Sequence, residues 1–413
     1  MIHEYINPDG VSQADLAVFI PSCREADSIT LPVRKAAIGL RKFFPDFSAV
    51  IVNCDNNSQD GTLEAFFAAE SNVPRIYAAS PPGLTGKGLN LKNAFEIAAR
   101  LGVKVAAIVD ANLLSIKSSW IKTLIQPVLD GAEYTAPIYL RHKNDAPISR
   151  ALGYPLFRAL FGRRVLQPIC VDHAFSGRLN EIFLQETWEA DDQGFRSDLR
   201  MLSLAIIHQA AVCQSVMAHP RLSEPGELDS DLPRSFSLVA QAFFEMMLET
   251  DEFWPGIKRS RPVALAGADL TPVNPPPVVE LDPAARIEEF ISLGRLYRAL
   301  WREYLPPQLS AFLEDQLDLA LAGGRPALPP DIWRDIIFEA ALAFKRSPEL
   351  RTDICASLGP PFLIRGLTVY LDSLTLADRQ YHALLENDAV IFETGKAELA
   401  RKWAEIQAKL GGA

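Results

Sequence analysis

Acidic and amide side chains crowd one short segment of the chain. Residues 51–62 read IVNCDNNSQDGT, so Asp55 and Asn57 directly follow a hydrophobic stretch and precede an Asp-Gly-Thr turn. Carboxylate and amide groups in such a place can bind a base or a ribose, and the loop 21–25, PSCRE, could close over the same ligand. Taken alone, the Asp-Asn-Asn-Ser turn has a plainer interpretation as a helix cap, because these residues favour caps and turns.

A second candidate is a glycine-rich loop around a lysine. Residues 85–90 read TGKGLN, with Gly86 and Gly88 on either side of Lys87 and a helical pattern directly after. Backbone N–H groups at a helix N-terminus, together with one cation, can bind a diphosphate. The loop is not a Walker A motif, whose lysine precedes Ser or Thr after a longer glycine spacing. A simple turn is the alternative.

A third candidate combines a carboxylate with an amide two residues later. Asp110 and Asn112 follow another hydrophobic stretch in the sequence VDAN. Oxygen ligands of this kind suit a divalent cation such as Mg²⁺ or Mn²⁺, although an amide in place of a second carboxylate removes one negative charge and should weaken binding. The alternative is an aspartate that only makes a turn at the end of a strand.

Alternating strands and helices must position these three motifs. Predicted strands cover 16–21, 49–53, 75–78, 105–109 and 133–140, and predicted helices cover 29–44, 61–69, 89–101, 118–130 and 198–209. This alternation predicts an α/β fold with a mostly parallel sheet and helices on both faces. Ligands of such sheets bind beyond the carboxyl ends of the strands, which is where each motif falls.

The C-terminal third has a different pattern. Helical periodicity covers 282–301, 308–321, 331–344, 361–371 and 378–409, separated by proline and glycine. The proline-rich segment 271–277, TPVNPPP, cannot continue a helix. The sequence therefore predicts a catalytic domain over 1–225, a linker and connecting helix over 226–280, and an all-helical domain over 281–413.

Composition limits the classes of partner. The formal net charge is −10, and such an acidic field disfavours a nucleic-acid or anionic-membrane surface. The five cysteines are scattered and show no CxxC spacing, so neither a disulfide framework nor a zinc site is indicated. The first residues lack a leader pattern, and no run approaches the roughly 18 apolar residues of a membrane span. We therefore expect a cytoplasmic protein.

The order of the motifs resembles that of a known fold family. IPSCREAD, VNCDNNSQDGT, TGKGLNLKNAF and VDAN are similar to the motif set of GT-A glycosyltransferases, the nucleotide-diphospho-sugar transferases, with VDAN in the place of their DxD motif. The following segments resemble two retaining enzymes more closely, mannosylglycerate synthase and glucosyl-3-phosphoglycerate synthase. They are Trp120, the loop RHKNDA (141–146), LQPICVD (166–172), Asp198 and MAHPR (217–221).

This resemblance implies transfer of a hexose from an NDP-sugar, UDP-glucose or GDP-mannose, to a small anionic hydroxy acid such as glycerate or phosphoglycerate, with retention. It implies a homodimer and Mg²⁺ or Mn²⁺ as cofactor. The implied catalytic residues are Asp198 and Asp110, and the implied metal ligands are Asn112 and His219. The implied donor residues are Pro21, Ser22, Glu25, Asp55, Asn57, Gly86, Lys87, Asp110 and Ile169. The implied acceptor residues are Arg141, Asp145 and Ala146.

The sequence departs from the motifs of these two enzymes at two places, and one segment has an unusual charge pattern. In the two enzymes that the sequence resembles, a glycine pair allows close backbone approach to the donor sugar, and here Cys170-Val171 stands in its place. Together with Asn112, it makes a nucleotide-sugar-binding pseudoenzyme the alternative function. Sugar-1-phosphate nucleotidyltransferases normally have a glycine-rich loop after the first strand. The segment PSCREAD has no glycine there, so this function is disfavoured. Residues 141–164 carry six basic side chains and only one acid, which suits an anionic acceptor or, alternatively, a solvated helix face.

Overall fold

The computed structural model describes residues 2–188, 194–217, 231–266 and 276–411. Its chain divides into two compact units, which we call the sheet unit and the helical unit. The sheet unit comprises Met1–Leu140, Leu166–Pro225 and Val263–Pro276, and the helical unit comprises Arg141–Val165, Gly226–Pro262 and Pro277–Ala413. The predicted boundary after residue 225 falls between the units. The segment 141–165, by contrast, belongs to the helical unit, and so does most of the predicted linker.

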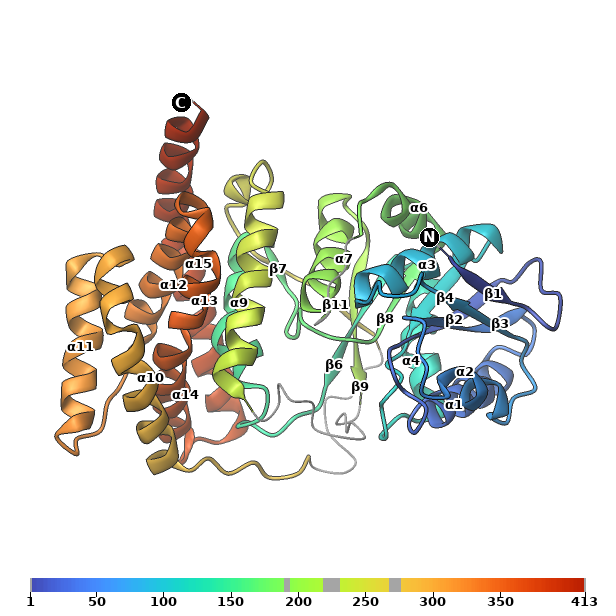
Figure 1. The fold of residues 1–413 in the computed structure, drawn as a ribbon, viewed down its shortest axis with the longest axis horizontal. Coiled ribbons are helices and arrows are strands. Elements are labelled where there is room, and N and C mark those ends of the chain that lie inside the picture. The colour runs from blue at the N-terminus through green and yellow to red at the C-terminus, as the bar shows by residue number, and fades with distance from the viewer. Residues whose placement is uncertain (1, 189–193, 218–230, 267–275, 412–413) are drawn as a thin grey trace. The chain divides into compact units, whose positions relative to one another are not determined.

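Strands in the described part of the sheet unit form one nine-stranded mixed sheet in the order β1-β4-β3-β2-β5-β8-β6-β9-β11 (Figure 1). They are β1 (Glu4–Ile6), β2 (Leu16–Ser22), β3 (Ala49–Asp55), β4 (Arg75–Ala79), β5 (Val105–Ile108), β6 (Tyr134–Tyr139), β8 (His173–Ser176), β9 (Val212–Met217) and β11 (Ala264–Ala266). The two strands β1 and β8 run antiparallel to their neighbours, and the other pairs are parallel.

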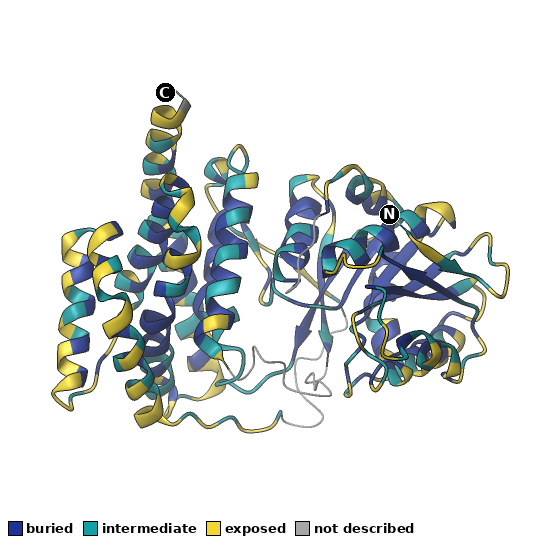
Figure 2. Cartoon of the chain, viewed as in Figure 1, coloured by how far each residue is buried: buried dark blue, intermediate teal, exposed yellow. Residues whose placement is uncertain are grey.

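Helices cover both faces of this sheet. They are α1 (Thr30–Phe43), α2 (Thr62–Ala68), α3 (Lys87–Arg100), α4 (Ser118–Leu129), α6 (Gly177–Gln185) and α7 (Phe195–Ile207). Helices α1 and α4 pack together on one face, and α3 packs with α6 on the other. Because both faces are covered, the central strand β2 is apolar and buried almost throughout (Figure 2). The predicted α/β fold with a mostly parallel sheet is confirmed.

The helical unit is built from α5 (Tyr154–Phe161), α9 (Leu232–Glu249), α10 (Pro283–Tyr304), α11 (Pro307–Leu321), α12 (Pro330–Arg346), α13 (Arg351–Ser357), α14 (Gly359–Ser373) and α15 (Asp378–Gly411). A π-helical turn, Ser149–Gly153, leads into α5, and the short strands β7 (Arg163–Arg164) and β10 (Arg261–Pro262) pair in parallel. The predicted all-helical C-terminal region is confirmed.

Aromatic rings form the centre of the helical unit. Phe236 of α9 stacks on Phe362 of α14 with ring centroids 4.2 Å apart, and it also contacts Trp333 of α12. The stretch Pro348–Ser373 is long and apolar enough to cross a membrane, but 67% of its most apolar window is buried within the structure. Most of this stretch, which includes α13 and α14, therefore lies in the core of this unit.

Candidate functional site

A pocket of about 760 Å³ lies at the carboxyl ends of the parallel strands in the sheet unit. This volume is typical of a ligand site. The loops after β2, β3, β4 and β5 all contribute to its wall. The lining residues are Pro21, Ser22, Cys23, Arg24, Glu25, Asn56, Asn57, Ser58, Gln59, Gly83, Thr85, Gly86, Lys87, Asn90, Ile108, Asp110, Asn112 and Val171. All of the predicted donor residues except Asp55 and Ile169 are among them.

Asp55 holds the first two loops together from inside the fold. Its carboxylate is fully buried and accepts hydrogen bonds from Ser22 Oγ at 2.6 Å, from the Ser58 backbone N–H at 2.6 Å and from the Tyr77 hydroxyl at 2.9 Å. Because these bonds link β2, β3 and β4, Asp55 positions the wall of the pocket and does not line it. Its predicted contact with a donor stays a prediction.

Three asparagine side chains leave unused acceptors at the pocket. Among the described residues, Oδ1 of Asn56, of Asn90 and of Asn112 is buried and has no hydrogen-bond partner. All three asparagines line the pocket. A buried acceptor without a partner costs free energy, so in native structures such groups usually face a ligand, a water molecule or an ion. These oxygens belong to residues of the pocket wall but have almost no accessible surface, so a ligand would reach them only after the side chains turn.

Helix α3 begins at the pocket with Lys87. Gly86 precedes the helix with φ 128°, a backbone conformation that favours glycine, and the N-terminus of this 14-residue helix lies at the pocket wall. A helix N-terminus attracts anions through these N–H groups and through its dipole. The predicted binding of a diphosphate by Gly86 and Lys87 is consistent with this position.

Lys87 forms a close ion pair with the predicted catalytic residue. Its Nζ lies 2.6 Å from Oδ1 of Asp198, and the carboxylate of Asp198 is almost fully buried. Burial lowers the pKa of Lys87, but the charge of Asp198 and its hydrogen bond outweigh that effect, so the pKa lies above its ordinary value. Gly194, just before α7, allows this approach, because a Cβ there would lie 2.6 Å from Cδ of Lys87.

The ion pair continues into a buried chain of hydrogen bonds. Nε2 of His173 lies 3.2 Å from Oδ1 of Asp198, and the Tyr134 hydroxyl lies 2.6 Å from Nδ1 of the same histidine. His173 has no exposed surface and Tyr134 is fully buried. These two residues fix the position of the Asp198 carboxylate. Neither was among the predicted site residues, although His173 directly follows the LQPICVD segment.

A second buried carboxylate supports Asp110. The Asp110 backbone N–H donates to Oδ1 of Asp172 at 3.0 Å, and the Tyr139 hydroxyl donates to Oδ2 at 2.5 Å. Burial raises the pKa of Asp172 to about 7, and the charge of Asp110 acts in the same direction. Burial also raises the pKa of Asp110 and of Glu25, which both line the pocket. The acids here would be stabilised by a bound cation.

Asp110 and Asn112 provide only part of the ligand set that a divalent cation needs. Among the described residues, Oδ1 of Asn112 is buried and has no partner, and the Asn112 backbone N–H donates to Oδ1 of Asp110 at 3.0 Å. Oxygen ligands are those that Mg²⁺ and Mn²⁺ prefer. Within the described ranges, no group of three or more His, Cys, Asp or Glu side chains could hold a metal. His219, the other predicted ligand, lies outside the described residues.

The predicted acceptor residues lie in the helical unit. Arg141 pairs with Asp145 at 3.1 Å, and the Ala146 N–H donates to Oδ1 of Asp145 at 2.6 Å. The basic side chains of 141–164 also bind groups of this unit: Lys143 donates to the Ser373 carbonyl, and Arg158 to Glu393. Much of the charge predicted to bind an anion is therefore engaged within the protein.

No family model matches the chain, and no curated protein matches it. Among solved structures it is similar to glucosyl-3-phosphoglycerate synthase from Mycobacterium tuberculosis in complex with Mn²⁺, UDP and glucosyl-3-phosphoglycerate, with 17% identity, 57% of this chain and 79% of that chain covered, and a TM-score of 0.44. The same enzyme with Mn²⁺, UDP-glucose and glycerol 3-phosphate matches with 18% identity, the same coverage and a TM-score of 0.42. Its complex with Mg²⁺ and UDP matches with 17% identity, the same coverage and a TM-score of 0.43.

Proposed function

We propose that this protein transfers a hexose from a nucleoside diphosphate sugar to the hydroxyl group of an acceptor. One observation carries the proposal. A single pocket at the strand ends gathers the loops of all three motifs, and Lys87 in its wall pairs with the buried carboxylate of Asp198. A polar, partly anionic ligand with a base, a ribose and a diphosphate matches these groups.

Each part of the donor has a candidate partner. The loops 21–25 and 56–59 would contact the nucleoside, and the N-terminus of α3 with Lys87 would bind the diphosphate. Asp110 and Asn112 would hold a divalent cation, which when bound stabilises the negative charge of the leaving diphosphate. Protonation of the leaving group by an acid is then unnecessary.

Asp198 would accept a hydrogen bond from the acceptor hydroxyl. Within the described part of the chain, Lys87 and His173 both contact Oδ1, and we assign that role to Oδ2. The acceptor that we propose is a small anionic hydroxy acid such as glycerate or phosphoglycerate, and the product forms with retention. Both points rest on the motif resemblance.

Thermal stabilisation tests donor and metal together. We expect UDP-glucose or GDP-mannose to raise the melting temperature more in Mn²⁺ or Mg²⁺ than in EDTA, because a ligand stabilises the state that binds it. Asn112→Ala should abolish the metal-dependent part of the shift, and Asn112→Asp should enlarge it. Asn72→Ala is the matched control, since Asn72 is exposed and outside the pocket.

The outcomes separate the two functions. A metal-dependent shift together with release of UDP or GDP in the presence of 3-phosphoglycerate or glycerate supports the transferase. A shift of equal size with and without metal, and without turnover, supports the nucleotide-sugar-binding pseudoenzyme, which the amide at position 112 favours. No shift with any nucleotide contradicts both.

Cys23 provides an independent probe of the same pocket. It is exposed and lines the pocket, whereas the other four cysteines are buried. We expect a saturating donor nucleotide to slow alkylation of Cys23 by N-ethylmaleimide by a factor of about 10 or more, because mass action leaves little empty pocket. Burial raises the pKa of its thiol and so slows the reaction. It is followed by peptide mass spectrometry near neutral pH, where the maleimide is selective for thiols. Sucrose at the same concentration is the control, and unchanged alkylation at a nucleotide concentration that gives a full thermal shift would place the ligand elsewhere.

A further inference from the structure

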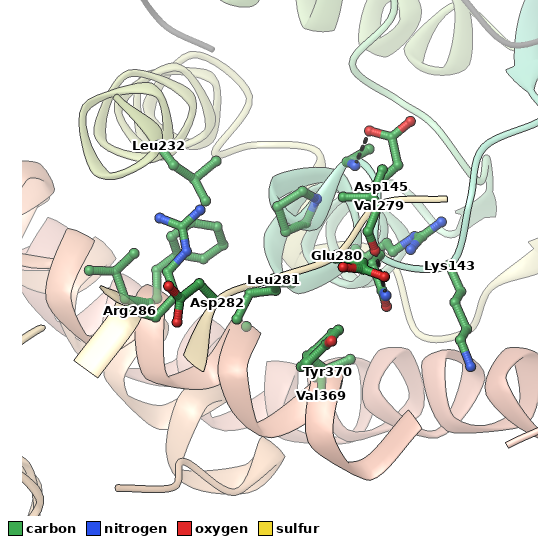
Figure 3. Close-up of a pocket in the computed structure, with 18 of the residues that line it drawn as sticks. Lys143, Asp145, Leu232, Val279, Glu280, Leu281, Asp282, Arg286, Val369 and Tyr370 are labelled. Carbon is green, nitrogen blue, oxygen red and sulfur yellow. Dashed lines mark hydrogen bonds between the residues drawn. The ribbon is translucent and has the colours of Figure 1, made fainter. Parts of the chain in front are cut away.

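The helical unit contains a pocket of its own. Its volume is about 460 Å³, within the range of small-molecule sites. Figure 3 shows the extended stretch from Val279 to Asp282 along the pocket, with Leu232 and Arg286 towards one end, Lys143 and Asp145 towards the other, and Val369 and Tyr370 of α14 beside it. Residues from α9, α10, α14, α15 and the loop 143–147 therefore surround one space.

Most of this wall is apolar or aromatic. The side chains of this kind are Ala146, Pro147, Ala151, Leu232, Val279, Leu281, Ala285, Phe362, Leu363, Val369, Tyr370, Tyr381 and Leu385. An apolar body would gain free energy from leaving water for such a space. A ligand consisting only of charged groups would not.

The cations at the wall are already engaged. Lys143 Nζ donates to the Ser373 carbonyl at 2.8 Å, and Arg150 donates to the His142 carbonyl at 2.7 Å and to the Tyr381 hydroxyl at 2.9 Å. Arg286 pairs with Glu289 at 2.9 Å. The acids Glu280, Asp282 and Asp388 also line the pocket. An anionic head group would therefore meet acids and committed cations.

Asp388 of α15 offers an acceptor that we assign to the head group. Its side chain is 10% exposed, and Oδ2 pairs with Arg365. No described residue hydrogen-bonds Oδ1 of Asp388. A hydroxyl or an ammonium group could donate to this oxygen, and the carboxylate charge would favour the ammonium.

Gly366 of α14 shows that the pocket has room at the helix surface. It lines the pocket, and a Cβ built on it would meet no atom within 4 Å. A larger side chain at this position would therefore enter the pocket without disturbing the backbone around it.

We propose that this pocket binds an amphipathic molecule with an apolar body and a hydrogen-bond-donating head, a hydroxyl or an ammonium, which Asp388 accepts. The inference does not depend on sugar transfer. Asp145 and Ala146, predicted as contacts of an anionic acceptor, line this pocket, so the two proposals assign ligands of different chemistry to this loop.

Three decyl compounds with different head groups test the proposal. In calorimetric titrations of the full chain, decylamine and decanoate are kept below their micelle concentrations and 1-decanol below its solubility limit. Decylamine and 1-decanol should bind at least tenfold more tightly than decanoate. Gly366→Leu should weaken binding of decylamine at least tenfold by filling the pocket. Gly256→Leu is the matched control, because Gly256 is exposed in the same unit, also has open space around its Cβ and lies outside the pocket. Asp388→Asn should reduce the preference for decylamine over decanoate at least threefold.

Several results would overturn the proposal. They are decanoate binding as tightly as decylamine, no binding by any of the three compounds, or unchanged binding in Gly366→Leu. A folding defect is not expected in that variant, because leucine favours the helix interior more than glycine does. If Asp388→Asn fails to fold, the ranking of head groups on the unmodified protein still decides. The nucleotide-induced thermal shift is measured in parallel, so that failure here is distinct from failure of the proposed transferase.

Discussion

Replacing Asp198 by asparagine is expected to lower the rate of sugar transfer about 10³-fold, the usual order for loss of a positioned acid–base group, while nucleotide affinity stays within about threefold. The substitution keeps the size of the side chain and removes only its charge. Its buried position and its bonds to Lys87 and His173 make the carboxylate a fixed group, so no neighbouring acid can replace it. Initial rates with nucleotide release and nucleotide titration measure the two quantities separately.

Replacing Lys87 by methionine should produce the opposite pattern. Loss of a charge-assisted hydrogen bond to a diphosphate costs about 1.5–3 kcal/mol, so nucleotide affinity should fall by about 10-fold to 100-fold. The single variant also leaves the Asp198 charge buried without its cation, which destabilises the fold. The double variant Lys87→Met/Asp198→Asn removes both charges and should recover part of that stability. If Asp198→Asn lowers nucleotide affinity as much as Lys87→Met does, Asp198 acts only through the lysine.

The donor side of the site could be predicted from the sequence because parallel strands place their carboxyl ends at one edge. The runs 16–21, 49–53 and 105–109 alternate with helical periodicity, so the residues after them had to lie close together. The support beneath these residues could not be predicted. Tyr77 reaches Asp55 across 22 positions, and β8 is only four residues long, so no periodicity indicates that His173 lies between β5 and β6.

The basic segment 141–164 shows a different limit of sequence reasoning. Its cations outnumber its acids locally, which favours an anionic ligand. Their partners come from distant parts of the chain: Arg158 pairs with Glu386 and Glu393 of α15, and Arg150 donates to Tyr381. Charge counted over a short segment cannot detect acids that lie more than 200 positions away and become neighbours only when the helices pack.

Asp172→Asn is expected to stabilise the sheet unit at pH 8 by about 2–4 kcal/mol in the absence of metal, given about 1.4 kcal/mol for each unit of pKa shift. The carboxylate of Asp172 is fully buried. Burial is the larger cause and the charge of Asp110 the smaller one that raise its pKa to about 7. An aspartate in the unfolded chain titrates near pH 3.9, so the folded state binds more protons between these values. Stability therefore falls as the pH rises through this window and levels off above about pH 7. Asparagine cannot ionise, and its Oδ1 can still accept from the Asp110 N–H.

Because only the unmodified protein loses stability as the pH rises, it should differ most from the variant at high pH. Hydrogen exchange of peptides spanning β5 and β8, corrected for the intrinsic pH dependence of exchange and recorded in EDTA, should show the variant and the unmodified protein converging near pH 4 and diverging towards pH 8. Tyr139→Phe is the control. It removes a hydrogen bond that stabilises the ionised form, and should lower stability at pH 8 by about 1 kcal/mol. A difference between Asp172→Asn and the unmodified protein that stays constant from pH 5 to pH 8 would mean that Asp172 is ionised throughout. In that case the acids around Asp110 would be stabilised by the protein alone, and they would gain much less from binding a cation.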